Sequence, residues 1–365
     1  MIKKTAALLA ILALLMSMLW PVQAQTTLPG QGESATVNFP YYIDFSLQIE
    51  SGAAITDIRL HYTVERDSFA DVISEAKAEI VPGTTVNAIW TWDLRRTGSL
   101  PSGTIIDYWW TLEDEAGNSY ITSKQTVIYE DSRFTWDSLE EGNINLYYYS
   151  GGESFARELL TSAQDSLTKL AADTGASLQK PIRVYIYADS SDLQGAMIFA
   201  QEWTGGVAYS REGAIAIGIN PGNLTWGKRA IAHELAHLVT EQMTSNPYNS
   251  IPLWLNEGMS VYAEGGIDPD NIGYLRQAVA TGSLISVRSL SGPFPADPDK
   301  TRLSYAESRS LVGFLIDTYG RDKIFELLNI FKQGSAYDDA FVSVYGFSMD
   351  GLNLLWQAYA EQEYK

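Results

Sequence analysis

The sequence predicts an α+β protein in which a β-sheet domain comes first and a domain of mixed strands and helices follows. Between residues 36 and 130, short segments of alternating apolar and polar residues recur with turn residues between them, which is typical of a β-sandwich. From residue 143 onward strands alternate with amphipathic helices, and after residue 253 nearly every segment has helical periodicity. A chain of 365 residues is long enough for two domains, each with its own core.

The first 24 residues have the pattern of a secretory signal peptide. Lys3 and Lys4 give a positive start, residues 6–20 are apolar, and residues 22–24 (Val-Gln-Ala) place small side chains before a cleavage site. The alternative is an uncleaved membrane anchor, but the apolar run is short for a span, and no later segment is long and apolar enough to cross a bilayer. We therefore expect a secreted, extracytoplasmic protein with no stable membrane span after cleavage. Residues 25–35 are expected to form a flexible lead-in.

Residues 36–130 are expected to form the β-sandwich domain. Turn residues flank its alternating segments, and residues 114–118 (Asp-Glu-Ala-Gly-Asn) predict a hairpin. In pattern this region resembles the immunoglobulin-like or fibronectin-type sandwiches of exported bacterial proteins, which host many roles and so indicate neither a function nor a partner. His61 lies within an alternating segment and is expected to be structural. The predicted strands are residues 45–49, 58–64, 87–92, 108–112, 119–122 and 125–129.

A polar, acidic stretch at residues 131–142 is expected to link the two domains, and residues 143–365 to form the second one. Residues 153–173 show the clearest amphipathic pattern there, with apolar side chains near one helical face. The predicted strands are residues 143–149, 181–187, 205–208 and 214–219. The predicted helices are residues 153–173, 192–200, 226–243, 254–264, 307–319, 322–332 and 349–361.

A histidine-containing motif in the helix predicted for residues 226–243 carries the chemistry. His233 and His237 stand four positions apart, so on a helix they project from one face, close enough to bind a single metal ion. Glu234 lies beside that site and can polarise a metal-bound water. The chain has only 3 histidines, which makes two incidental histidines on a surface helix the weaker alternative. The next predicted helix brings Glu257 to the same ion.

The composition restricts the metal and the partners. The chain has no cysteine, so disulfides and thiolate ligands are impossible, and a metal site must use His, Asp and Glu. Such a set favours zinc with an open coordination position. The formal net charge is −19 and no long basic run offsets it, which argues against a nucleic-acid partner.

The motif resembles that of the gluzincin metallopeptidases. The pattern His233-Glu234-x-x-His237, followed by Trp-Leu-Asn-Glu-Gly at residues 254–258, is most similar to the bacterial peptidase MA-like domains, relatives of thermolysin and the zinc aminopeptidases. The strong part of the match covers residues 233–264, and a weaker similarity of element order extends over residues 143–365. The resemblance implies a zincin-like metallopeptidase domain that acts on peptide or protein substrates.

The resemblance also implies roles for individual residues. His233, His237 and Glu257 would be zinc ligands, and Glu234 would be the general base that moves a proton from the zinc-bound water to the leaving amine. Glu264 stands seven positions after Glu257, on the same helical face, and would orient a ligand histidine. A solvated surface charge is an equal alternative for Glu264.

Two later features bear on the reaction. Tyr305, expected to open a helix, is the candidate for stabilising the oxyanion because no histidine follows His237, and ordinary packing is the alternative. The zinc aminopeptidases carry a Gly-x-Met-x-Asn strand, whereas the Gly-Ala-Met at residues 195–197 continues without the needed Glu or Asn, which favours an endopeptidase. The predicted hairpin at residues 205–219 either offers an edge strand to an extended peptide or merely completes the sheet.

The sequence therefore predicts a secreted zinc-dependent peptidase. The alternative is a non-catalytic exported binding module in which the zinc site is structural. A structural site is normally closed by four protein ligands, and the sequence nominates no fourth one.

Overall fold

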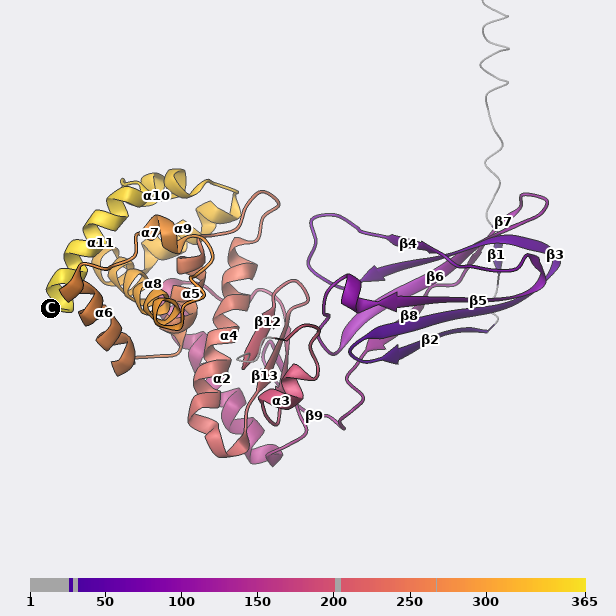
Figure 1. Cartoon of the computed structure of the whole chain (residues 1–365), viewed down its shortest axis with the longest axis horizontal. Coiled ribbons are helices and arrows are strands. Elements are labelled where there is room, and N and C mark those ends of the chain that lie inside the picture. Colours follow the sequence, from indigo (N-terminus) through magenta and orange to yellow (C-terminus); the bar gives the residue numbers. More distant parts are fainter. Residues whose placement is uncertain (1–25, 29–31, 201–204, 267) are drawn as a thin grey trace, which may run out of the picture.

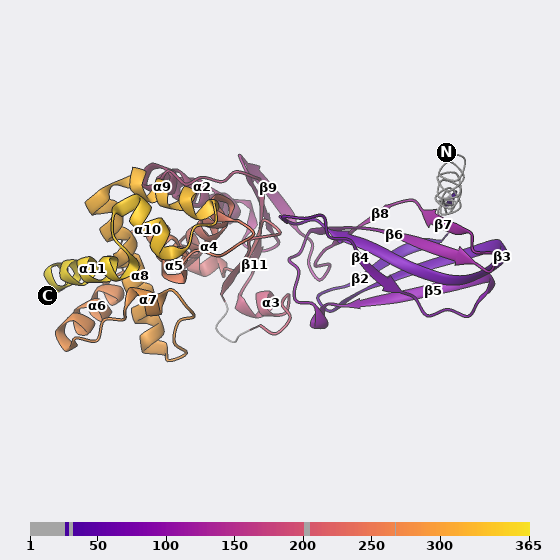
Figure 2. The ribbon, with the colours of Figure 1, turned by 90° about the horizontal axis from the view of Figure 1, so that it is seen from above.

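The molecule has a β-sheet domain at one end and an α+β domain at the other (Figure 1). This computed structural model describes residues 26–28, 32–200, 205–266 and 268–365, so the expected signal peptide lies outside the described residues. A perpendicular view shows the same arrangement, with the C-terminus at the end away from the sheet domain (Figure 2). Within the described part of the chain, no helix combines the length and the apolar character that a membrane span needs.

The first domain is built around one long strand, β3. Its first half pairs with β2 and β5 and its second half with β4 and β6, with a register shift between Glu50 and Ile55. The strands predicted at residues 45–49 and 58–64 are thus two parts of one element. The eight strands of this sheet are β1 (Thr26–Leu28), β2 (Glu33–Asn38), β3 (Tyr42–Val64), β4 (Ser74–Lys77), β5 (Gly83–Asp93), β6 (Thr104–Asp114), β7 (Ser119–Thr122) and β8 (Gln125–Tyr129).

Alternation along these strands builds the core of the first domain. Burial alternates residue by residue along β6, and Trp110 on that strand packs with Phe45 and Leu60 of β3 among fully buried side chains. His61 stacks on Trp109, in keeping with a structural role. The lead-in expected at residues 25–35 contains β1, which pairs with β7, and the start of β2. The immunoglobulin-like arrangement of this β-sheet domain stays a prediction.

The second domain contains a five-stranded sheet in the order β12-β13-β11-β10-β9. Its three central strands run parallel, and β9 and β12 pair antiparallel at its two edges. β11 and β13 are largely apolar and buried, as parallel strands covered on both faces require, whereas burial alternates along β10. The strand β9 lies within the range 131–142 that was expected to be a linker. The strands are β9 (Asp137–Glu141), β10 (Ile144–Tyr148), β11 (Ile182–Tyr187), β12 (Gly206–Tyr209) and β13 (Ala214–Gly218).

Different layers cover the two faces of this sheet. Helices α2 (Gly152–Thr174) and α4 (Leu224–Thr244) share a core with the apolar side chains of one face. The other face carries tyrosines that pack with the short helix α3 (Ser190–Gln194), which is shorter than the helix predicted at residues 192–200. On this face the domains touch, because Arg183 donates a hydrogen bond to the Gly103 carbonyl of the first domain. Tyr187 donates one to the buried Asp131, in the segment between the domains.

The C-terminal part is helical and has its own large core, in which Trp254 and Trp356 are fully buried. Its helices are α5 (Leu253–Ala263), α6 (Pro269–Thr281), α7 (Val287–Leu290), α8 (Pro298–Tyr319), α9 (Arg321–Lys332), α10 (Tyr337–Tyr345) and α11 (Met349–Glu363). The start of α8 corrects one expectation. Asp297 caps its N-terminus and Pro298 occupies its first turn, so Tyr305 lies inside this helix rather than opening it. The α+β class predicted from the sequence is confirmed.

Candidate metal centre

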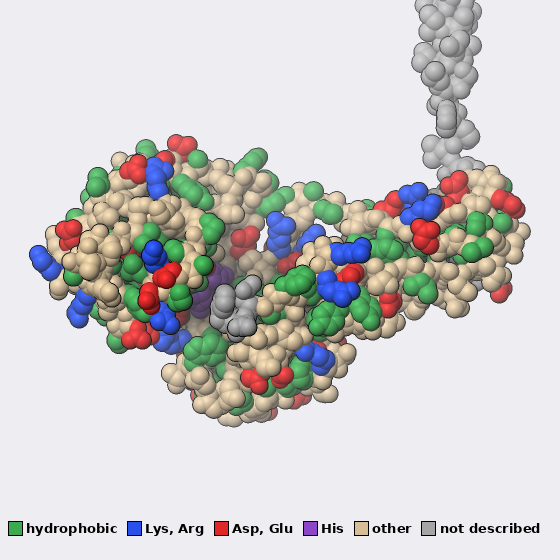
Figure 3. Space-filling model, in the orientation of Figure 1, with side chains coloured by type: hydrophobic (Ala, Val, Ile, Leu, Met, Phe, Trp, Pro, Cys, Tyr) green, Lys and Arg blue, Asp and Glu red, His purple; other side chains and the backbone are tan. Residues whose placement is uncertain are grey.

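Helix α4 places both motif histidines on the face opposite its core-facing side. Ile231, Leu235 and Leu238 of this helix are buried against the sheet. One turn apart on the other side, the His233 and His237 side chains are 19% and 15% exposed, and their ring centroids are 4.9 Å apart. Histidine side chains are visible at the surface in the hollow of the second domain (Figure 3). The helix thus anchors the pair rigidly while leaving it accessible.

Helix α5 brings Glu257 to the two imidazoles. Its Oε2 lies 3.6 Å from Nε2 of His233 and 3.6 Å from Nε2 of His237, and the two Nε2 atoms are 3.2 Å apart. Oε2 of Glu257 is buried without a hydrogen-bond partner, although a buried carboxylate oxygen normally has one. Three ligand atoms within 4.8 Å of one another, one of them orphaned, fit a shared cation. Two imidazoles and a carboxylate are a donor set that suits zinc.

The other nitrogen of each imidazole has its own partner. Nδ1 of His233 lies 2.9 Å from Oε1 of Glu264, and Nδ1 of His237 lies 3.2 Å from Oδ1 of Asn256. In a neutral imidazole whose Nδ1 donates to these oxygens, Nε2 would present its lone pair to the space that the histidines share with Glu257. Glu264 is therefore not an isolated surface charge. The contact of Asn256 was not foreseen, although its position beside Glu257 on α5 was a usable indication.

The charges around the histidines favour a cation. Burial lowers the pKa of His233, but the carboxylates of Glu257 and Glu264 outweigh this effect and raise it to about 10. Burial alone would raise the pKa of Glu257, yet the two imidazoles hold it below its usual value. Arg229 of α4 donates to Oε2 of Glu264 from two nitrogens, at 2.9 and 3.2 Å, and so fixes that carboxylate.

Glu234 lies at the same site, pressed against the edge of the sheet. Burial raises the pKa of Glu234, while the charges of His237 and His233 act in the opposite direction. A Cβ atom at Gly206 of β12 would lie 2.7 Å from Oε1 of Glu234, so any other residue there would force this carboxylate out of its position. Gly206 was not singled out from the sequence, because its proximity to Glu234 depends on the order of strands in the sheet.

Tyr305 of α8 also reaches this site. Its ring centroid lies 6.5 Å from that of His233, and Phe294 packs edge-on against it at 5.2 Å. Burial and the nearby carboxylates of Glu257 and Glu234 raise the pKa of Tyr305 to about 12. The phenol therefore keeps its proton at neutral pH and can donate a hydrogen bond.

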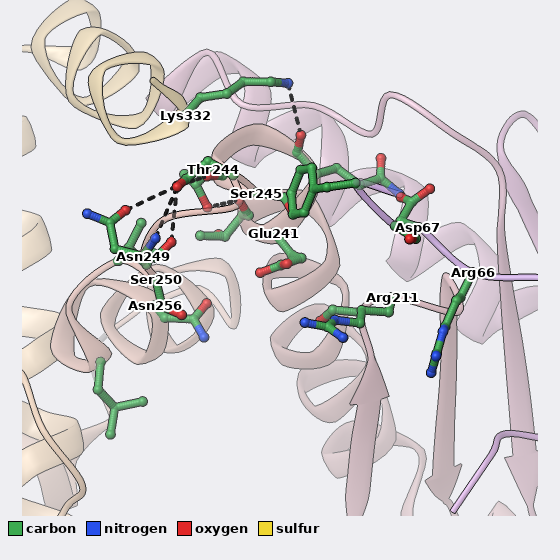
Figure 4. Close-up of a pocket in the computed structure, with 18 of the residues that line it drawn as sticks. Arg66, Asp67, Arg211, Glu241, Thr244, Ser245, Asn249, Ser250, Asn256 and Lys332 are labelled. Atoms are coloured by element: carbon green, nitrogen blue, oxygen red, sulfur yellow. Dashed lines mark hydrogen bonds between the residues drawn. The ribbon is translucent and has the colours of Figure 1, made fainter. Parts of the chain in front are cut away.

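A cavity of about 940 Å³ adjoins this cluster between the two domains (Figure 4). Asn256 contributes to its wall and also contacts Nδ1 of His237, so this residue lies between the cavity and the histidine site. Residues of the sheet domain, the β12–β13 turn and the end of α4 line part of the remainder, and segments of the helical C-terminal part line the rest. Both domains therefore contribute to the walls of this cavity.

The comparisons with known proteins identify the family. The model of the peptidase MA superfamily matches residues 162–362, which is more than half of the 365-residue chain and includes the whole histidine cluster. The chain belongs to the peptidase MA superfamily. With its cluster of two histidines and a glutamate, it is a zinc metallopeptidase, and thus a hydrolase with Zn²⁺ as its cofactor.

Solved structures of zinc metallopeptidases resemble this peptidase at low identity. The M1 zinc metallopeptidase of Deinococcus radiodurans is 13% identical, with 91% of each chain covered and a TM-score of 0.36. The aminopeptidase N family protein of Idiomarina loihiensis is 13% identical, with 84% of this chain and 71% of that chain covered and a TM-score of 0.36. No curated protein sequence matches the chain.

Proposed function

We propose that this zinc metallopeptidase is a secreted endopeptidase in which His233, His237 and Glu257 hold the zinc and Glu234 is the general base. The observation that carries the proposal is the single cluster that joins three ligand atoms, their two supporting side chains and an adjacent buried carboxylate. Among the described residues, the group of possible metal ligands around the two histidines has three members. Three protein ligands are typical of a catalytic site, whereas a structural zinc site is normally closed by four.

The side chains divide the work of peptide hydrolysis. A zinc ion held by His233, His237 and Glu257 would lower the pKa of its bound water and polarise the scissile carbonyl. Glu234 accepts the proton of the attacking water and delivers it to the amine nitrogen as that group leaves. The protonated phenol of Tyr305 donates a hydrogen bond to the negative charge that develops on the former carbonyl oxygen. Glu264 and Asn256 hold the imidazoles in orientation and tautomer.

The edge of the sheet at β12 supports the proposal that the enzyme is an endopeptidase, which cuts within a peptide chain. Among the described residues, strand β12 pairs on one side only, with β13, so its other side can offer backbone groups to an extended peptide next to Glu234. The described residues of β12, Gly206–Tyr209, include no carboxylate that would hold a free amino terminus. The Gly-Ala-Met at residues 195–197 lies after α3 and outside every strand.

The experiment that tests this proposal compares the mature protein with Glu234→Gln on a mixed library of quenched peptides, with zinc supplied. Glu158→Gln is the matched control, since Glu158 lies on α2 in an exposed ion pair with Lys228. Cleavage by wild type and the control but not by Glu234→Gln is expected, and internal fragments in the mass spectrum identify an endopeptidase. No cleavage by any form with zinc bound would favour the non-catalytic binding module. The N-terminal residue of protein recovered from the culture medium tests secretion and cleavage after Ala24.

A further inference from the structure

The cavity beside the metal centre carries positive charge in a strongly acidic protein. Four of its charged lining residues are cationic and two are anionic: Arg66, Lys180, Arg211 and Lys332 against Asp67 and Glu241. The whole chain has 44 acidic and 25 basic residues. A local excess of cations next to a catalytic site, against this background, attracts anionic groups of a substrate.

Two of these cations have neither an ion-pair partner nor a hydrogen-bond partner among the described residues. Lys180 forms an ion pair with Asp67, and Lys332 donates to the Gln242 carbonyl at 3.3 Å. The guanidinium groups of Arg66 and Arg211 take part in no ion pair or hydrogen bond within the described part of the chain. Each guanidinium offers five N–H donors in a planar fork that fits a carboxylate. Figure 4 shows both side chains on the same side of the cavity, with Arg211 pointing towards Glu241 and Asn256.

Glu212 lies near both arginines, but neutralising its carboxylate does not explain why Arg66 and Arg211 are there. Burial raises the pKa of Glu212, and the charges of Arg66, Arg211 and Arg183 lower it. None of the three forms an ion pair with Glu212 within 4 Å, and Arg183 is already bonded to the carbonyls of Gly103 and Glu212. Arg66 and Arg211 are both exposed, so their donors face the solvent-filled cavity.

The contact between the domains fixes the spacing of the two arginines. The backbone N–H of Asp67 donates to the Arg211 carbonyl at 2.6 Å, and the Asp67 side chain binds Lys180. Arg66 and Arg211 therefore extend from two backbone segments that are hydrogen-bonded to each other. A carboxylate bound between them meets a site that is organised before the substrate arrives.

The position of Arg211 relates this site to the edge strand. β12 runs from Gly206, beside Glu234, to Tyr209, and Arg211 lies in the turn that follows. The three residue steps along β12 span about 10 Å. A peptide paired antiparallel with β12 runs towards its own N-terminus in this direction. We propose that Arg66 and Arg211 bind a carboxylate of the peptide substrate, foremost an Asp or Glu side chain a few residues N-terminal to the scissile bond.

This inference rests on the proposed peptidase function, and its test separates the two. Matched quenched peptides carry Glu or Gln at each position around the cleaved bond, and each is made with a free and an amidated C-terminus. We expect wild type to cleave the Glu peptides with a kcat/KM about tenfold higher at N-terminal-side positions, and the preference to fall as salt is added. A preference that depends instead on a free C-terminus would assign the carboxylate to the chain end and overturn the assignment to a side chain.

The double variant Arg66→Gln/Arg211→Gln supplies the second arm. It is expected to lose the preference for Glu while cleaving the Gln peptides as wild type does, and Arg276→Gln, an exposed arginine on α6, is expected to change neither. Equal cleavage of Glu and Gln peptides by wild type, or a preference that survives in the double variant, would refute the inference. If wild type cleaves nothing, the proposed function fails by itself. The anisotropy of the same peptides, labelled, on zinc-loaded wild type and the double variant then decides whether the arginines bind the carboxylate.

Discussion

Replacing Gly206 with alanine tests whether the position of the Glu234 carboxylate matters for activity, because it adds a single Cβ atom next to that group. The new Cβ would lie 2.7 Å from Oε1 of Glu234, about 0.7 Å short of the 3.4 Å at which ordinary contact begins. It would also lie 3.2 Å from Cδ and Cγ of the same side chain. The glutamate is the flexible partner in this contact, so its carboxylate moves and the strand stays in place. The substitution therefore displaces the proposed general base without touching a metal ligand.

The expected result is a loss of activity without a loss of stability. A misplacement of about 1 Å in a reacting group can lower the rate about 100-fold, so a shift of about 0.7 Å should lower kcat/KM by about 10- to 100-fold. That range corresponds to about 1.4–2.7 kcal/mol in the activation free energy. Gly206 does not adopt a positive φ, and alanine at such a position stabilises a protein slightly by restricting the unfolded chain. The melting temperature should stay the same or rise.

The assay measures cleavage of the best library peptide, zinc content and thermal unfolding for Gly206→Ala and for Gly205→Ala. The control adds the same methyl group one residue away, where its Cβ would meet the ring of Trp226 at 3.2 Å. Full zinc content with lowered activity in Gly206→Ala alone supports the assignment of Glu234. Equal activity in both variants would show that the position of Glu234 against β12 does not limit the reaction. Loss of zinc in Gly206→Ala would show that the substitution acts on the metal site instead.

Three further predictions concern the supporting residues. Glu264→Gln weakens the partner of His233 Nδ1, so zinc affinity measured by competition with a chelator should fall about 10- to 100-fold while the fold persists. Tyr305→Phe should lower kcat about 100-fold with zinc retained, and unchanged turnover would remove the phenol from the mechanism. Burial raises the pKa of Glu307, which is fully buried, from 4.5 to about 8, so the folded state keeps a proton that the unfolded chain releases. Stability should therefore fall by up to about 4 kcal/mol between pH 5 and pH 8, and urea titrations of Glu307→Gln should show that dependence removed.

Local spacing explains why most of the cluster could be predicted from the sequence. His233, Glu234 and His237 occupy neighbouring positions of one helix, and Glu257 and Glu264 share a face of the next one, so helical geometry alone brings each set together. Their chemical roles remain predictions that the experiments above test. The start of α8 was also accessible, because Asp297 followed by Pro298 is a helix-start pattern.

Features that depend on long-range pairing could not be predicted in the same way. β9 is acidic and largely exposed, so only its pairing with β10 makes it a strand. The chain from residue 42 to 64 contains Ser51 and Gly52, which favour a turn, but pairing with several neighbouring strands keeps it extended. The contact between Gly206 and Glu234 needs both the position of β12 at the sheet edge and the packing of α4 against it.

The glycine after Glu257 shows how packing between helices sets the chemistry. A Cβ at Gly258 would lie 2.4 Å from the Ser308 carbonyl oxygen and 2.7 Å from Val312, so α5 and α8 approach each other more closely than any other residue would allow. Glu257 on α5 faces the histidines of α4, while Tyr305 on α8 lies less than one turn before Ser308. Because Gly258 has no side chain, α5 and α8 pack closely, and the position of the Glu257 carboxylate is coupled to that of the Tyr305 phenol. A larger residue at Gly258 would push α8 away from α5 and move the proposed oxyanion donor away from the zinc site, even though every ligand remained on its helix.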